Sequence, residues 1–221
     1  MRDRSRSTRR TWTTALLLTG TLLGGTGCGG SSSQPPPELP QQLQLVAEAD
    51  AFVCSDDWAD QNHGTESYSP RAVGQQNDFT GNQVGRQVYR FAAPGAWSGA
   101  VVASATLRLM VYDNYAGFPL DMSILGYPDG WSETGITWQN APLASAGALD
   151  TVTVGCCGKA WEFDVTDYVN AQLAAGDTNF SLELRSDDEA SIGGVRWWQR
   201  EGDGVTINMI TGEAPALTLE R

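Results

Sequence analysis

The sequence is poor in the residues that most enzymes use as nucleophile, base or transition-metal ligand. It contains a single histidine, His63, and four cysteines in 221 residues, and no Gly-x-Ser-x-Gly motif marks a nucleophile. One histidine in a polar stretch supports neither a zinc site nor, on its own, a catalytic triad. These absences favour a protein without catalytic activity, and paired carboxylates of the glycosidase kind remain the catalytic alternative.

Basic residues are also scarce once the N-terminal segment is set aside. Residues 28–221 carry nine Lys and Arg against 25 Asp and Glu, a formal net charge of −16. Phosphate binding requires a basic surface, so this balance argues against nucleic acid as a partner. The acidity itself is typical of a soluble secreted domain.

The N-terminal segment has the pattern of an export signal. Five arginines precede an apolar stretch, residues 15–23, that is too short to span a bilayer permanently. Residues 9–12 (RRTW) resemble a twin-arginine signal, and the small residues before Cys28 resemble a lipobox. We expect a signal peptide over residues 1–28 and an extracellular or cell-envelope location. Lipidation of Cys28, which would be the only attachment to a membrane, and ordinary signal cleavage are the two alternatives, because Gly25 stands where a lipobox usually has leucine.

A tether separates this signal from the folded part. Residues 29–42 are rich in glycine, serine and proline, which make the backbone flexible or extended and leave nothing to form a core. Residues 43–221 have a length at which β-sandwiches commonly stay undivided. We therefore predict one folded domain after the tether.

Short runs of alternating apolar and polar residues, rich in Val, Ile, Thr, Tyr and Trp, fill this domain. No helix-length amphipathic segments alternate with them, which argues against a parallel sheet of βαβ units. The predicted fold class is all-β, a jelly-roll-like antiparallel β-sandwich with one short helical turn. The predicted strands are residues 51–54, 86–91, 103–112, 120–127, 151–154, 160–165, 180–185, 195–200, 205–210 and 216–220.

The single helical turn is predicted from apolar residues spaced to share one helix face, at positions 165, 168, 169 and 173. Thr166 or Asp167 can cap its start, and Gly176 can end it. We expect this turn to cover one end of the sandwich.

Three cysteines follow Cys28, namely Cys54, Cys156 and Cys157. An oxidising compartment favours a disulfide between Cys54 and one of the adjacent pair, which leaves one thiol over. A metal site is the competing interpretation, but His63 lacks zinc-type spacing from these cysteines.

Several segments resemble, in the same order, the family 96 carbohydrate-binding modules, also called DNRLRE domains. The most specific segment is residues 129–142 (DGWSETGITWQNAP), which has Trp131, Glu133, Thr137 and Trp138 at the family spacing. We interpret Trp131 and Trp138 as structural residues of a buried turn between strands rather than as residues that stack on a sugar. The other matching segments are residues 49–53 (ADAFV), 88–91 (VYRF), 102–111 (VASATLRLMV), 161–166 (WEFDVT), 197–201 (WWQRE) and 215–219 (PALTL).

This resemblance covers about residues 50–219 and implies a jelly-roll sandwich that binds polysaccharide, with acidic polymers such as alginate among the family's ligands. The segment 197–199 and the cysteine pair depart from the family pattern. Substitutions on one face of a strand change specificity without changing the core, so these departures concern the ligand rather than the fold.

Strand alternation places several basic side chains at outward positions. If Leu107 and Leu109 face the core, Arg108 points outward, and the same reasoning applies on the other strands. A guanidinium donates paired hydrogen bonds to carboxylate or hydroxyl oxygens, and an exposed indole stacks on a sugar ring, which suits uronate-containing glycans. The alternative is that the arginines only pair with neighbouring carboxylates such as Glu183, Glu201 or Asp164. The predicted carbohydrate-binding residues are Arg90, Arg108, Arg185, Arg196, Trp198 and Arg200.

We therefore predict a cell-surface or secreted polysaccharide-binding module. A structural or adhesive surface protein that binds a protein partner is the alternative, and a polysaccharide-degrading enzyme is less favoured. No cofactor is expected beyond a structural calcium ion, which oxygen-rich loops at residues 55–57, 113–114 and 187–189 could bind. Asp-rich segments of this kind are more often plain turns.

Overall fold

The computed structural model describes residues 38–78, 81–114 and 119–221. The contacts within the chain divide it into residues 1–37 and a second unit, Glu38–Arg221, which contains all the elements considered below. The predicted signal peptide and Cys28 lie outside the described residues. Among the described residues, no helix is long and apolar enough to cross a membrane.

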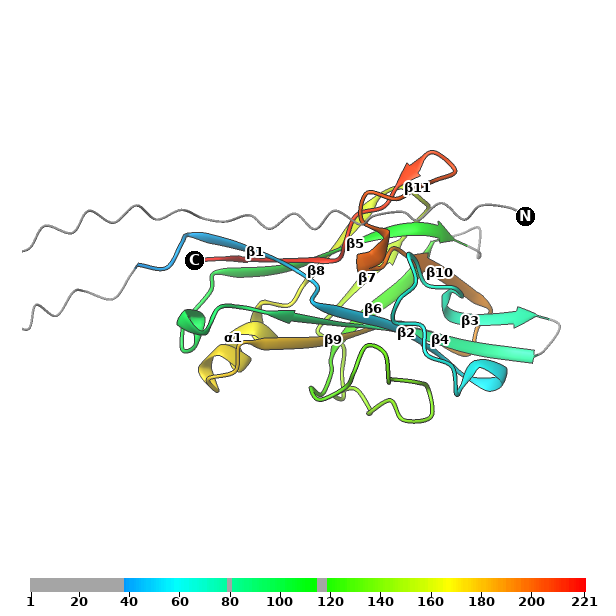
Figure 1. Cartoon of the computed structure of the whole chain (residues 1–221), viewed down its shortest axis with the longest axis horizontal. Helices are drawn as coiled ribbons and strands as arrows, with labels where there is room; N and C mark the ends of the chain where they lie inside the picture. The colour runs from blue at the N-terminus through cyan, green and yellow to red at the C-terminus, as the bar shows by residue number, and fades with distance from the viewer. Residues whose placement is uncertain (1–37, 79–80, 115–118) are drawn as a thin grey trace, which may run out of the picture. The chain divides into compact units, whose positions relative to one another are not determined.

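The described part folds as a β-sandwich of two antiparallel layers, which confirms the predicted all-β class (Figure 1). The layer with β1 and β5 lies above the layer with β2, β4 and β9 in this view. The strands of the first layer, in order, are β1 (Gln42–Val46), β13 (Ala216–Glu220), β5 (Ser104–Asn114) and β8 (Ala160–Asp164). Those of the second layer are β2 (Ala49–Cys54) and β3 (Val73–Asp78) along one edge of β4 (Gly81–Ala92), then β9 (Asn179–Ser186), β6 (Leu120–Gly126) and β7 (Asp150–Val154).

One strand, β10 (Gly193–Trp197), joins the two layers. It pairs with β3 on one side and with the C-terminal half of β5 on the other, and its register shifts between Arg196 and Trp197. The N-terminal half of β5 pairs instead with β13 and β8. The layers are therefore two parts of one continuous sheet that folds back on itself at β10.

The core lies between the layers and follows the predicted alternation. Leu107 and Leu109 of β5 face Tyr89 and Phe91 of β4 within one apolar cluster, and all four are almost fully buried. The helix α1 (Thr166–Ala174) closes one end of this core with Val169 and Leu173. Burial of such side chains is the main favourable contribution to folding.

The prediction that Thr166 or Asp167 caps α1 is wrong, because the N-cap is Val165 and the side chain that binds the first turn is that of Asp164. Asp164 Oδ1 accepts hydrogen bonds from the backbone N–H and the hydroxyl of Thr166, at 2.9 and 2.5 Å. These bonds hold the pKa of Asp164 below its usual value. Gly176, with a φ of +86°, follows the helix as expected of a terminating glycine.

A second apolar cluster lies on the outer face of the second layer. The loop of residues 127–145 folds over β2 and β4 and packs Trp131 and Ile136 against Ala51 and Val88. Position 64, beside this loop, accommodates only glycine, because a Cβ there would collide with the backbone of Glu133. The matching segment 129–142 thus has the buried, structural role that the sequence indicated for Trp131.

Several regions differ from the predicted strands. No strand was predicted at β1 or β3, and the strand predicted at 195–200 ends at Trp197, so Arg200 does not occupy the outward strand position expected of it. One strand was predicted at 205–210. The structure has a hairpin of β11 (Thr206–Ile207) and β12 (Ile210–Thr211) there, with Asn208 and Met209 at positive φ. Three short 3-10 helices complete the described part: η1 (Asp56–Trp58), η2 (Gly95–Trp97) and η3 (Arg200–Gly202).

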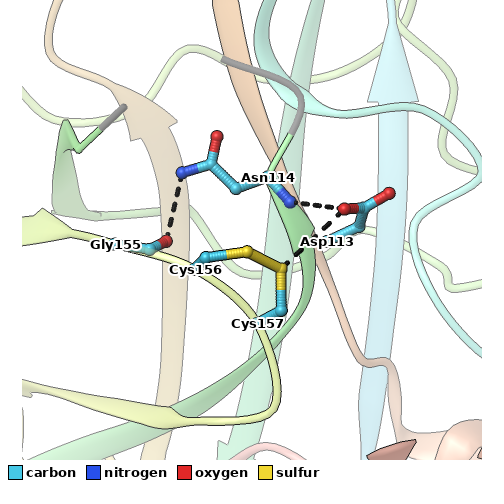
Figure 2. The surroundings of a disulfide bond; sticks show 5 residues. All are labelled: Asp113, Asn114, Gly155, Cys156 and Cys157. Atoms are coloured by element: carbon cyan, nitrogen blue, oxygen red, sulfur yellow. Dashed lines mark hydrogen bonds between the residues drawn. A yellow bond between two sulfur atoms is a disulfide. The ribbon is translucent and has the colours of Figure 1, made fainter. Parts of the chain in front are cut away.

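The predicted disulfide between Cys54 and the adjacent pair is wrong. Cys156 and Cys157 are bonded to each other in the turn between β7 and β8 (Figure 2), so neither is available to Cys54. The carbonyl oxygen of Gly155 in this turn accepts a hydrogen bond from the Asn114 side chain at 3.1 Å. The Cys54 thiol is buried in the core instead, with Gln83 Oε1 at 4.0 Å.

The expectation of an exposed indole at Trp198 is also wrong, because Trp198 is only 1% exposed. Its ring meets Tyr68 and Tyr112 edge to face, and residues Gly202 and Gly212 press against its other side. A segment that follows β10 in the chain therefore covers the outward face that alternation assigned to Trp198.

This close packing predicts that Gly202→Ala destabilises the protein by about 1–3 kcal/mol, because the added Cβ would lie 2.5 Å from the Trp198 ring and closer still to the Ser67 carbonyl oxygen. Urea unfolding monitored by tryptophan fluorescence measures the change. Gly95→Ala is the matched control, since its Cβ would meet nothing within 4 Å. Equal stability of the two variants would contradict the packing described for Trp198.

Candidate functional site

The predicted arginines do not share one open face. Arg108 lies on the first layer, where it forms an ion pair with Glu213. Arg90 and Arg185 lie on β4 and β9 of the second layer, Arg196 sits with its guanidinium 5.9 Å from the Tyr68 ring centre, and Arg200 is in η3. The alternative that these arginines pair with carboxylates holds for most of them, so each has to be judged by its surroundings.

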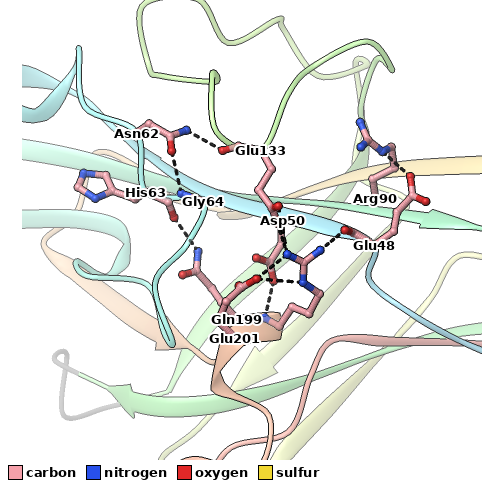
Figure 3. A network of polar contacts seen from close by, with 10 residues as sticks. Glu48, Asp50, Asn62, His63, Gly64, Arg90, Glu133, Gln199 and Glu201 are labelled. Carbon is pink, nitrogen blue, oxygen red and sulfur yellow. Dashed lines mark hydrogen bonds and ion pairs between the residues drawn. The ribbon is translucent and has the colours of Figure 1, made fainter. Parts of the chain in front are cut away.

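Arg90 and Arg200 belong to one polar network beside the 127–145 loop (Figure 3). Arg90 donates to Glu48 Oε1 at 2.7 Å and to the Trp131 carbonyl oxygen at 2.9 Å, and its guanidinium lies 5.0 Å from the Trp131 ring centre. Arg200 donates to the Glu48 carbonyl oxygen and to Glu133 and Glu201. These contacts fasten the loop to β4 and η3 and engage each guanidinium with several protein acceptors.

Three carboxylates surround Arg200 in this network. Asp50, Glu133 and Glu201 each place one oxygen within 4.8 Å of the others, a spacing that could hold a metal ion. Asp50 Oδ2 accepts a hydrogen bond from the Arg200 backbone N–H at 2.8 Å, and the Asp50 N–H donates to Glu133 Oε1 at 3.1 Å. Asp50 is fully buried, and burial raises its pKa to about 8.

The open part of the second layer presents a different arrangement. Arg185 of β9 is the cross-strand neighbour of Ser123 on β6, which is in turn the neighbour of Thr151 on β7. Arg86 of β4 lies on the other side of Arg185. The adjacent residues Gln87 and Leu184 are paired across β4 and β9, and the next position along this antiparallel pair brings Arg86 opposite Arg185. We call the outward side chains of Arg86, Arg185, Ser123 and Thr151 the arginine row.

Both guanidiniums of the arginine row converge on one carboxylate. Glu183 Oε1 lies 3.9 Å from Arg86 Nη1 and 4.0 Å from Arg185 Nη1. Glu183 is 2% exposed, whereas the Arg185 side chain is 34% exposed. Arg86 also binds Glu189 through two hydrogen bonds of 2.8 Å. Of these two arginines, Arg185 is therefore the more exposed one, and its ion pair with Glu183 holds it in place.

An aromatic side chain and a pocket lie at one end of the arginine row. The Arg86 guanidinium is 4.9 Å from the ring centre of Trp138, which the 127–145 loop supplies. A pocket of about 220 Å³ opens there, lined by Arg86, Trp138, Glu183 and the exposed Leu143 among others. The Trp138 indole, the Arg86 guanidinium and the Glu183 carboxylate thus line one pocket at the end of the row.

The electrostatics of this place are unusual for a surface. Burial raises the pKa of Glu183, while the two arginines act in the opposite direction. Among the described residues, Glu183 Oε1 and the Tyr127 hydroxyl are buried and have no hydrogen-bond partner. Glu183 is thus closed to a ligand and holds the two guanidiniums in place, while the exposed Arg185 can donate hydrogen bonds to ligand carboxylates.

Sequence reasoning found Arg185 but missed its companions. Arg86 lies four positions before Arg90 on the same strand, so alternation alone could have placed it outward. Glu183 was named only as a pairing partner, and Trp138 was assigned to a buried turn. Nothing in the sequence indicated that the 127–145 loop would bring Trp138 to β4.

Comparison with protein families gives one finding. The model of carbohydrate-binding module family 96 matches residues 41–210, which cover most of the sandwich and every residue of the arginine row. Comparison with the curated proteins finds no match.

Glu183→Gln removes the buried titrating group and nearly keeps its shape. Because the pKa of Glu183 in the folded protein is raised above 4.5, its ionised form costs stability, and protonation relieves that cost. The quantity to compare is the free energy of unfolding of the wild type minus that of the variant. We expect this difference to increase as the pH is lowered from above the raised pKa of Glu183 towards 4.5. Urea unfolding of both proteins between about pH 8 and pH 4 measures this difference. A difference that stays constant, or shrinks as the pH falls, would contradict the assignment.

Proposed function

Because the chain belongs to carbohydrate-binding module family 96, we propose that this non-catalytic module binds acidic, uronate-containing polysaccharide through the arginine row. Carbohydrate binding follows from the family. The acidic ligand and the place where it binds are proposals, supported by the geometry of β4, β9 and the 127–145 loop.

The observation that carries the proposal is the convergence of Arg86 and Arg185 on Glu183 beside Trp138. In a chain whose residues 28–221 have a net charge of −16, an anionic polymer needs a local site of opposite charge. Arg185, a third exposed, can donate two parallel hydrogen bonds to one carboxylate. The exposed Thr151 continues the row with a hydroxyl group that suits sugar oxygens, and the buried Ser123 beside it holds that hydroxyl through a hydrogen bond of 2.7 Å.

The shape of this surface also suits a polymer better than it suits a small molecule. The row crosses the strands of the second layer from β4 to β7, and the pocket at its end is shallow compared with typical small-ligand sites of about 300–1,000 Å³. Successive sugar units can lie along such a row, each with a few polar contacts. We further propose that the predicted signal exports the module and that Cys28 anchors it to the cell envelope.

Removal of the solvent-facing guanidinium tests the site. We expect Arg185→Ala to weaken binding to a uronate polymer such as alginate or pectate about tenfold, because a charge-assisted hydrogen bond contributes roughly 1.5–3 kcal/mol. Affinity electrophoresis and isothermal titration calorimetry measure the change. Binding should also weaken as salt rises, since part of the attraction is between exposed charges.

Arg108→Ala is the matched control, because Arg108 is an ion-paired arginine of similar exposure on the other layer. It should leave the affinity unchanged. A loss as large as that of Arg185→Ala would move the site away from the arginine row. Equal affinity of the wild type for uronate polymers and neutral glucans would contradict an acidic ligand while leaving carbohydrate binding in place.

A further inference from the structure

The network around Arg200 carries more negative charge than its cation balances. Arg200 faces three carboxylates, those of Asp50, Glu133 and Glu201, and the nearby Arg90 is already paired with Glu48. An ionised carboxylate taken from water into the protein interior is costly unless it is paired. The ionised cluster therefore requires a further positive charge.

Two oxygens of the cluster point to where that charge belongs. Asp50 is fully buried, and within the described part of the chain its Oδ1 has no hydrogen-bond partner although Oδ2 binds the Arg200 N–H. Glu201 Oε2 is likewise buried without a partner there, while Oε1 binds Arg200. Figure 3 shows the Asp50, Glu133 and Glu201 side chains gathered at one place in this network.

We propose that Asp50, Glu133 and Glu201 form a calcium site that fastens the 127–145 loop to the sandwich. The oxygens lie within 4.8 Å of one another, close enough for one cation to contact all three at Ca–O distances of about 2.4 Å. All three ligands are carboxylates, and neither imidazole nor thiolate takes part in the cluster, so a hard cation is favoured over zinc or copper. With Arg200 retained, a divalent ion brings the three carboxylates to neutrality.

The remaining coordination positions fall to water. The side chains of Glu133 and Glu201 are 20% and 28% exposed, so solvent reaches one side of the cluster while Asp50 closes the other. The ion connects three segments that are distant in the sequence, namely β2, the 127–145 loop and η3. The oxygen-rich loops at 55–57, 113–114 and 187–189, where the sequence suggested calcium, are not part of this group.

The test is calcium binding by the full chain after treatment with EGTA. We expect titration calorimetry to detect one site, and calcium at about 100 times its Kd to raise the Tm by roughly 5–10 °C over the value in EGTA. Glu133→Gln and Glu201→Gln should each lower the affinity at least tenfold. Glu213→Gln, which removes an arginine-paired carboxylate outside the cluster, should bind calcium like the wild type.

Asp50→Asn distinguishes two sources of the positive charge, a bound calcium ion and a proton held on Asp50. If the cluster binds calcium, Asp50→Asn loses the calcium-dependent rise in Tm. The proposal is overturned if the wild type shows no binding heat and the same Tm in calcium and EGTA. It is also overturned if Asp50→Asn matches the wild type in calcium affinity, because Asp50 would then not be a ligand.

Discussion

The arrangement of this molecule depends on the packing of the 127–145 loop against the outer face of β2 and β4. Small residues on β2 leave room for Trp131 and Ile136, and that second apolar cluster removes one side of the layer from water. The same packing brings Trp138 over Arg86 and the Trp131 carbonyl oxygen to Arg90. The loop thus divides one sheet face into a covered, structural part and an open part, where Arg185 of β9 and Thr151 of β7 reach the surface.

Charge explains why the two parts differ in function. The chain has few basic residues, and its carboxylates bind most of the guanidiniums described above. Beneath the loop, Arg90 and Arg200 are held on several sides and act as structural groups. On the open part, Arg185 meets only the edge of Glu183, at 4.0 Å, and keeps its hydrogen-bonding fork towards solvent. An anionic ligand requires a positive group that is held in position and still has hydrogen-bond donors free to bind the ligand.

Much of the fold could be read from the sequence, because alternation reports which face of a strand meets the core. It placed Leu107 and Tyr89 inward correctly, and most of the strands lie where it put them. It could not show β3, whose residues 73–78 (VGQQND) lack an apolar alternation. Nor could it show that distant segments cover an outward position, which is why Trp198 is buried. The site was half predictable for the same reason: Arg185 follows from alternation, but Trp138 reaches the site only through the path of its loop.

The central claim is that the open face of the second layer binds an acidic sugar chain. Backbone amide NMR of the chain, titrated with a uronate oligosaccharide, tests it most directly because it locates contacts without any substitution. The account predicts that the largest shift changes follow the arginine row, at Arg86, Arg185, Ser123 and Thr151, and extend to the Trp138 indole. Shift changes confined to the outer face of β5 and β13, where Arg108 lies, would contradict it.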